Sequence, residues 1–417
     1  MKISKRLFNN FNFLFFMGTF ILIFNPPIFS FNTMHIVGVC SLLYMFVNFN
    51  KTVLVFSKKD IWILFLSFVG IFLYLFSVVC LHNDKPISYV VMPLYYILDI
   101  IPFGVAVRIY SDKHNCKSQD FINLMIQAGK LQAILAIAAF FIPSIHKYFL
   151  NMLIDYGYTD YFKYLSNYRI FGLASSLTFA MPVVQTVFAL ILLHPECRGK
   201  TNIPSALILF FSALINARVS IIVAGIGFIV LVLFGSFSIS KKIRMIVVVL
   251  VAFICLIYFI LPLIEQYSPW TYKWMMSGVD DIWAFLGGDN SGRYFSYATS
   301  AEQYKVPDDF VDVLVGKGHS TMGLDAEIYG YQSDVGFIND IWLGGVLYVF
   351  FLYCLHIKYM CKLFKSSKSL VSFIGILMLI VSLIINIKGQ AFAKASFSIF
   401  FFLVCVVEMS KTQIDEK

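Results

Sequence analysis

Long apolar runs separated by short polar stretches set the pattern of this chain. One helix needs about 20 mostly apolar residues to cross a bilayer. Backbone polar groups inside a bilayer must pair within the chain, and these runs lack the alternation of strands in a membrane barrel. We therefore expect an all-α integral membrane protein with about twelve transmembrane helices, at residues 11–31, 33–49, 60–81, 89–110, 121–143, 176–194, 203–217, 219–235, 244–263, 337–357, 369–386 and 393–409.

The boundary between the seventh and eighth predicted helices rests on a short interruption. Residues 204–234 are apolar except around Asn216-Ala217-Arg218, which leaves two interpretations, one long tilted helix or two helices joined by a tight hairpin. Lys and Arg residues are retained on the cytoplasmic side of a membrane. With a hairpin at Arg218 and a cytoplasmic N-terminus, every cytoplasmic segment is basic, including the lysine cluster at 358–368. The charges therefore favour the hairpin and place both termini in the cytoplasm.

The composition excludes a soluble protein. The chain is 59% hydrophobic and 13% charged, whereas soluble domains are nearer 45–50% apolar and about 25% charged. The net charge of +9 follows from the membrane topology, so we expect no nucleic-acid partner. The N-terminal run has no cleavage site after it and is interpreted as a retained first helix.

Polar segments divide the chain into three parts. Residues 1–263 hold the first nine helices and a periplasmic loop at 144–175, residues 264–336 form a large periplasmic loop, and residues 337–417 hold the last three helices and a short cytoplasmic tail. The large loop is rich in carboxylates and aromatic rings. Such side chains bind sugars, because rings pack on sugar C–H faces and carboxylates accept hydroxyl hydrogen bonds. An interfacial aromatic belt explains the rings near the loop ends equally well.

Basic residues on the outer side of the membrane break the cytoplasmic preference for positive charge. Arg169, Arg218 and Arg293 lie at or beyond the outer face. A guanidinium binds phosphate oxygens in bidentate fashion, so these three arginines, together with Lys388, are candidate ligands of a lipid diphosphate. The alternatives are ion pairs with loop carboxylates for the arginines and snorkelling to the interface for Lys388.

Three residues could accept a proton at the outer face. His319, the single histidine of the large loop, has a pKa suited to proton transfer near neutrality. Asp334 and Asp340 lie where the chain returns to the membrane. A structural histidine and helix N-caps at the start of the tenth span are the alternatives. We take Arg293, His319 and Asp334 as the candidate catalytic residues.

Asp99 and Lys130 are charges within the fourth and fifth predicted spans. Intramembrane charges are costly and need a partner, and consecutive antiparallel helices would place these two at similar depth. We expect them to pair, either structurally or as part of a proton path in a transporter.

Motifs for soluble substrates and cofactors are missing from the sequence. It has no P-loop, no dinucleotide-binding glycine pattern and no zinc-protease motif, and its eight cysteines lie in spans or on the cytoplasmic side. We therefore expect no cofactor and no metal. An activated substrate should arrive within the membrane, carried on a lipid.

The layout and several short motifs resemble the Wzy-type O-antigen polymerases, which are related to the O-antigen ligases. Twelve spans, one large outer loop before the last three and arginines at the outer face carry the resemblance over nearly the whole chain. The similar stretches are residues 168–172, 215–220, 291–293, 315–319 and 333–336.

This resemblance implies a lipid-diphosphate-dependent glycosyltransferase in the bacterial inner membrane. Its substrates would be oligosaccharide repeat units on undecaprenyl diphosphate, and its partners would include a chain-length regulator and other O-antigen assembly proteins. Arginines would stabilise the departing diphosphate, and His319 or Asp334 would accept the proton of the acceptor hydroxyl.

Two other functions remain as alternatives. O-antigen ligases usually place a His-Asn or similar pair just before the span that follows the loop, whereas this chain has Gln332-Ser333-Asp334 there, which weighs against a ligase. A lipid-linked oligosaccharide flippase would normally show internal repeats or charges in many spans, and only Asp99 and Lys130 lie deep in this chain.

The predicted topology can be tested with fusions. Alkaline phosphatase fused after Asp309 should be active, because that loop is predicted to lie outside, and a fusion after Lys365 should be inactive. The reverse activities would refute the topology and the sites assigned from it.

Overall fold

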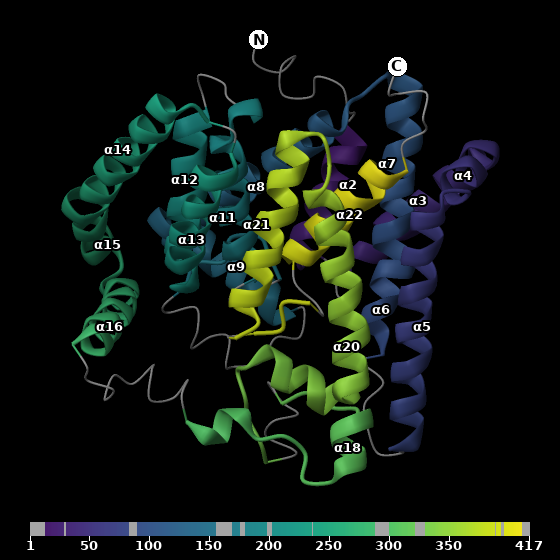
Figure 1. The fold of residues 1–417 in the computed structure, drawn as a ribbon. Helices are drawn as coiled ribbons and strands as arrows, with labels where there is room; N and C mark the ends of the chain where they lie inside the picture. The colour runs from purple at the N-terminus through teal and green to yellow at the C-terminus, as the bar shows by residue number, and fades with distance from the viewer. Residues whose placement is uncertain are drawn as a thin grey trace.

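The computed structural model describes residues 13–28, 31–82, 90–155, 169–175, 180–197, 202–235, 237–287, 300–321, 330–387, 389–392 and 396–410. Within these ranges the chain is helical and contains no strand (Figure 1). The predicted all-α class is therefore confirmed.

Most helices follow the apolar runs of the sequence, whereas those at Pro143–Asp155, Pro269–Leu286 and Phe310–Val315 lie in the two stretches predicted as loops. The helices before the predicted hairpin are α2 (Phe13–Phe24), α3 (Met34–Val47), α4 (Phe49–Phe56), α5 (Lys59–Leu81), α6 (Val91–Tyr95), the π-helix η2 (Tyr96–Ile100), α7 (Ile101–His114), α8 (Ser118–Phe141), α9 (Pro143–Asp155), α11 (Ala180–Leu193), the 3-10 helix η3 (Pro195–Cys197) and α12 (Asn202–Leu214). Those after it are α13 (Val219–Phe234), α14 (Ile239–Cys255), the π-helix η4 (Leu256–Ile260), α15 (Leu261–Tyr267), α16 (Pro269–Leu286), the 3-10 helix η5 (Ala301–Tyr304), α18 (Phe310–Val315), α20 (Gly336–Phe364), α21 (Ser369–Ile385) and α22 (Ser396–Met409).

Four helical stretches are long and apolar enough to cross a membrane: Lys59–Leu81, Val91–His114, Ser118–Phe141 and Gly336–Phe364. The pair α3 and α4, bent by 104°, would make a fifth. Shorter apolar helices fill six more of the predicted runs. α12 ends at Leu214 and α13 begins at Val219, so the interruption at 216–218 is a turn between two helices.

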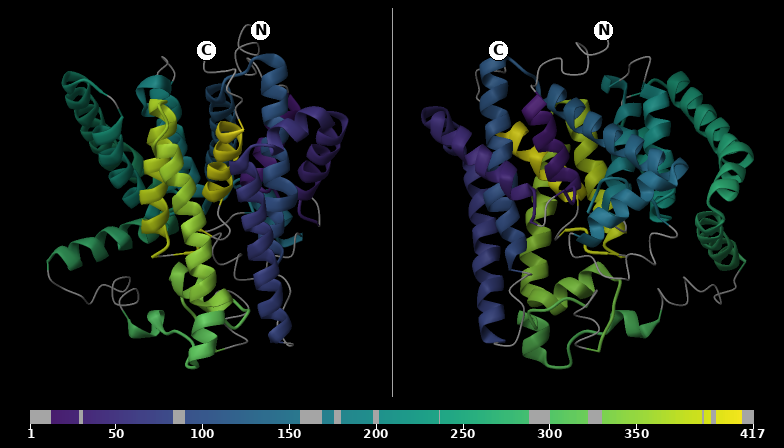
Figure 2. Two further views of the ribbon diagram at one scale, coloured as in Figure 1. Left: turned by 45° about the vertical axis from the view of Figure 1, so that its right-hand side comes forward. Right: turned by 180° about the vertical axis from the view of Figure 1, so that it is seen from behind.

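The core lies around two helices that are buried along nearly their whole length. α11 and α22 expose almost none of their side chains, which fits their apolar composition on every face. α22 packs against α7, α11 and α2. α14, α15 and α16 lie along one side of the bundle (Figure 2).

α5 and α20 lie side by side with opposite directions. At one end Lys362 forms an ion pair with Asp60, and the Tyr359 hydroxyl donates to the Asp60 carbonyl over 2.7 Å. At the other end His82 Nε2 lies 3.1 Å from the Gly316 carbonyl oxygen. The two helices therefore connect the lysine-rich end of the molecule to the segment around α18 (Figure 1).

α20 is broken at Gly345. This residue has φ +70° and ψ −178°, a conformation that is essentially restricted to glycine. In a straight helix, residues 13 positions apart would lie about 20 Å apart along the axis, yet the Tyr353 hydroxyl donates to Asp340 Oδ2 over 2.8 Å. Residues 336–344 therefore fold back against the longer part of the helix.

The break removes the helical partners of the carbonyl groups that precede it, and other groups replace them. Lys317 N donates to the Trp342 carbonyl over 2.7 Å, and Gly318 N donates to the Leu343 carbonyl over 3.1 Å. The Tyr74 hydroxyl lies 2.8 Å from the Gly344 carbonyl oxygen. A Cβ on Gly316 would come within 2.5 Å of Gly344 Cα, so the close approach needs glycine.

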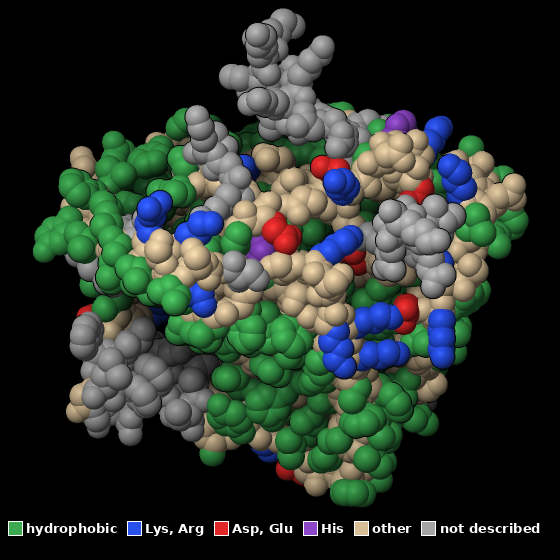
Figure 3. Space-filling view, turned by 45° about the horizontal axis from the view of Figure 1, so that its top comes forward, with side chains coloured by type: hydrophobic (Ala, Val, Ile, Leu, Met, Phe, Trp, Pro, Cys, Tyr) green, Lys and Arg blue, Asp and Glu red, His purple; other side chains and the backbone are tan. Residues whose placement is uncertain are grey.

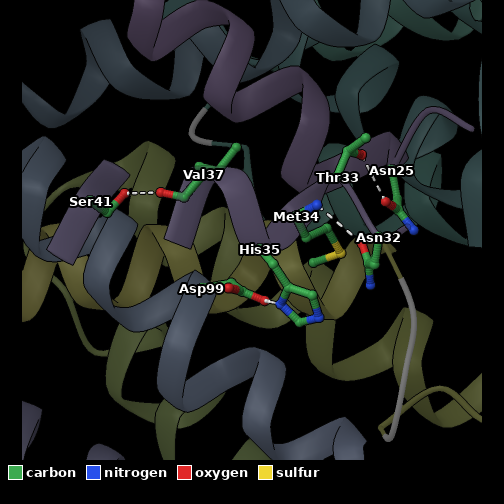
Figure 4. A network of polar contacts seen from close by, with 8 residues as sticks. All are labelled: Asn25, Asn32, Thr33, Met34, His35, Val37, Ser41 and Asp99. Atoms are coloured by element: carbon green, nitrogen blue, oxygen red, sulfur yellow. Dashed lines mark hydrogen bonds and ion pairs between the residues drawn. The ribbon is translucent and has the colours of Figure 1, made fainter. Parts of the chain in front are cut away.

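The expected pair of Asp99 and Lys130 is wrong. Asp99 Oδ2 lies 3.0 Å from His35 Nδ1 of α3 (Figure 4). The reason is that consecutive helices are not the principal neighbours here: α7 packs mainly against α3 and α22, and α8 mainly against α2 and α12. Gly38 allows the approach, since a Cβ there would meet Asp99 Oδ1 at 2.1 Å.

Replacing Gly345 tests the break. Gly345→Ala should lower the free energy of unfolding by at least about 2 kcal/mol, because alanine is strained in this conformation and its Cβ would meet the Leu314 carbonyl oxygen at 2.3 Å. Thermal unfolding of the purified protein measures the loss. Gly225→Ala is the matched control, since Gly225 is helical with open space around it; equal stabilities of the two variants would contradict the break.

Candidate functional site

Two of the predicted phosphate ligands, Arg169 and Arg218, meet on one aromatic ring. The Cζ atoms of Arg169 and Arg218 lie 5.1 and 4.9 Å from the centroid of the Trp274 ring, within the range of cation–π attraction. The two guanidinium carbons are therefore no more than about 10 Å apart. Arg218 Nη1 also donates to Ser277 Oγ over 3.0 Å. We call Arg169, Arg218, Trp274 and Ser277 the arginine cluster.

A small apolar core holds the arginine cluster in place. Ile170, beside Arg169, and Ile215, just before the turn that carries Arg218, are buried against Met275 of α16. Trp274 packs on the same core. Three segments far apart in the sequence are thus fixed by burial of the residues next to the charged ones.

The arrangement suits a polyanion. Both guanidinium groups are half-buried, so their charges are less screened than those of exposed side chains. A diphosphate offers several oxygens to two forked donors. Within the described residues, no group of three His, Cys, Asp or Glu side chains could hold a metal ion.

His319 belongs to a second group of residues, which lies next to the α20 break. Its side chain is 3% exposed and its ring centroid lies 5.2 Å from that of Trp342. The Ser320 carbonyl oxygen can only accept, so the contact of 3.1 Å assigns the proton to His319 Nδ1. Nε2 then carries the lone pair, as a base requires.

Asn339 ties the His319 segment to the short arm of α20. Asn339 Oδ1 accepts from Ser320 Oγ over 3.1 Å and from Thr321 N over 2.9 Å. Its Nδ2 donates to the Ser333 carbonyl over 2.9 Å. All of these groups are buried. We call residues 316–321 with Ser333 and Asn339 the loop cluster.

Asp334 lies beside the loop cluster and is half-buried. Its backbone N–H donates to Gln303 Oε1 over 2.9 Å. The N-cap position of α20 is Val335, without a side-chain cap, so the helix-capping alternative for Asp334 is wrong. The carboxylate of Asp334 does not serve to start the helix.

Asp340 is fully buried among neutral donors. Besides Tyr353, Gln390 Nε2 donates to its Oδ1 over 3.0 Å. Asn386 Nδ2 in turn donates to the Tyr353 hydroxyl. These bonds join the short arm of α20 to the segment after α21, which precedes the last helix.

Arg293 and Lys388 lie outside the described residues. In the sequence, Trp274 is one of many aromatic residues of the large loop, and neither it nor Asn339 had a predicted role. The Gly344-Gly345 pair inside an apolar span was a usable signal of a broken helix.

Comparisons with protein-family models, curated proteins and solved structures find no match to this chain. Function is therefore argued from the residues themselves.

The role of Asn339 can be measured by proteolysis. Asn339→Ala removes four buried hydrogen bonds, to Ser320 Oγ, Thr321 N and the carbonyl groups of Ser333 and Val335, which costs about 2 kcal/mol or more. Cleavage by trypsin after Lys317 should then be at least about tenfold faster than in the unmodified protein. Mass spectrometry of the fragments gives the rate.

Ser320→Ala is the matched control, because it removes only one of these bonds. It should accelerate cleavage by a smaller factor. Unchanged cleavage in Asn339→Ala would show that Asn339 does not anchor the segment.

Proposed function

We propose that this chain polymerises oligosaccharide repeat units carried on undecaprenyl diphosphate, as the Wzy-type O-antigen polymerases do. The protein would cross the bacterial inner membrane twelve times, with both termini in the cytoplasm and both clusters at the periplasmic face. The observation that carries the proposal is the meeting of Arg169 and Arg218 on Trp274, because two convergent guanidinium groups suit a lipid diphosphate.

The reaction transfers the growing glycan. The hydroxyl of the non-reducing sugar on a new lipid-linked unit attacks the anomeric carbon of the growing chain. A new glycosidic bond forms, and the bond from the anomeric carbon to the diphosphate oxygen breaks. The lipid diphosphate leaves with the electron pair, and the arginine cluster, with Arg293 and Lys388, stabilises its charge.

The acceptor proton needs a base in this scheme. The two candidates are His319 and Asp334. His319 has its lone pair on Nε2 when the ring is neutral, and Asp334 is a half-buried carboxylate just before α20. The carboxylates and rings of residues 264–336 would hold the glycan. A chain-length regulator and other O-antigen assembly proteins would be partners.

The arginine cluster gives the sharpest test. Arg169→Ala and Arg218→Ala should abolish polymerisation, and Arg→Lys should rescue it poorly, because lysine keeps the charge and loses the fork. Loss of a charged contact costs several kcal/mol, and each about 1.4 kcal/mol is tenfold in rate. The lipopolysaccharide gel should show core plus a single repeat unit and no ladder, since the ligase is intact.

Lys273→Ala is the matched control. Lys273 is a cation of the same helix that lies over Trp270 instead, 5.9 Å from the ring centroid, and its loss should leave the ladder intact. Bare core with polymer accumulated on the lipid carrier would indicate a ligase, and bare core without polymer a transporter. An unchanged ladder in both Arg→Ala variants would remove the arginine assignment.

A further inference from the structure

A groove runs between α5 and α20 on the apolar flank of the molecule. It has a volume of about 500 Å³ and is lined by Ser67, Gly70, Ile71, Tyr74, Tyr348, Phe351, Cys354, Leu355 and Lys358. Lys358 is the one charged residue of this lining. From Tyr348 to Lys358 the groove follows ten residues of helix, about 15 Å, which is half the roughly 30 Å thickness of a bilayer's hydrocarbon core.

The charged end of the groove lies in a basic rim. The contacts of Lys362 and Tyr359 with Asp60 bring the start of α5 to the end of α20. Lys58 and Lys59 therefore lie at the same end as Lys358 and the exposed Lys365. Figure 3 shows Lys and Arg side chains gathered on this end of the molecule, beside a largely apolar flank.

Carboxylates neutralise only part of this rim. Asp60 forms an ion pair with Lys362, and Glu408 Oε2 lies 3.5 Å from Lys368 Nζ. Lys58, Lys59, Lys358 and Lys365 have no carboxylate in ion-pair contact among the described residues. The rim thus offers several lysines to an anion at the mouth of an apolar groove.

We propose that this groove binds an anionic glycerophospholipid of the cytoplasmic leaflet. One acyl chain would lie between α5 and α20, and the phosphate would lie at Lys358. Basic pockets between transmembrane helices on the cytoplasmic side are suited to such headgroups, each lysine contributing about 1 kcal/mol of attraction. The proposal rests on α5 and α20 as membrane helices and is independent of the polymerase assignment.

The structure supplies separate tests for the chain and for the headgroup. A Cβ on Gly70 would meet open space, so Gly70→Leu fills the groove without disturbing the helix. Gly225→Leu makes the same change in α13, where the space is equally open. Lys358→Gln removes the charge and keeps the groove, and Lys241→Gln changes an exposed lysine at the start of α14.

Native mass spectrometry of the purified protein with added dioleoyl phosphatidylglycerol or dioleoyl phosphatidylcholine gives the readout. The unmodified protein and the variants Gly225→Leu and Lys241→Gln should retain more phosphatidylglycerol than phosphatidylcholine. Lys358→Gln should lower that preference about fivefold, and Gly70→Leu should lose both lipids. Equal retention of the two lipids by the unmodified protein, full retention by Gly70→Leu, or an unchanged preference in Lys358→Gln would overturn the proposal.

Discussion

The need to satisfy three backbone carbonyl groups in an apolar setting organises the end of this protein around α18 and the break in α20. The break at Gly345 deprives Trp342, Leu343 and Gly344 of their helical partners. A buried carbonyl without a hydrogen bond is costly, above all where lipid replaces water. The backbone of residues 317–318 and the Tyr74 hydroxyl supply the missing donors. The position of His319 follows directly, because it is the next residue along the chain.

The same break also places Asn339 and Asp340. Folding the short arm of α20 back brings Asn339 under the His319 segment and Asp340 against Tyr353 and Gln390. The arginine cluster is built by other means. Its charges meet on an indole ring above a small apolar core, so its geometry depends on how α16 docks. Backbone hydrogen bonds fix one cluster, and aromatic packing fixes the other.

The sequence predicted the all-helical class and most of the helices, because long apolar runs at a known length determine them locally. It missed α16, which carries Trp274 and lies in a stretch predicted as a loop. The turn at 216–218 was also accessible, since the distribution of lysines discriminated between the two interpretations. The partner of Asp99 was not accessible, because it depends on which helices become neighbours, and α3 rather than α8 adjoins η2. The convergence of Arg169 and Arg218 was anticipated from charge alone. Trp274 as their meeting point was not, since a ring among many aromatic residues carries no distinguishing local signal.

One side chain of α5, Tyr74, contacts both the groove between α5 and α20 and the break in α20. Tyr74 lines the end of the groove away from Lys358, and its hydroxyl contacts the carbonyl oxygens of Val315 and Gly344 over 3.1 and 2.8 Å. An acyl chain bound in the groove, as proposed above, would therefore pack against a residue that is bonded at the α20 break. The single hydroxyl proton of Tyr74 is shared between these two carbonyl oxygens, so a displacement of the ring would weaken a contact at the α20 break. Tyr74 is therefore the side chain that connects the lining of the groove with the α20 break.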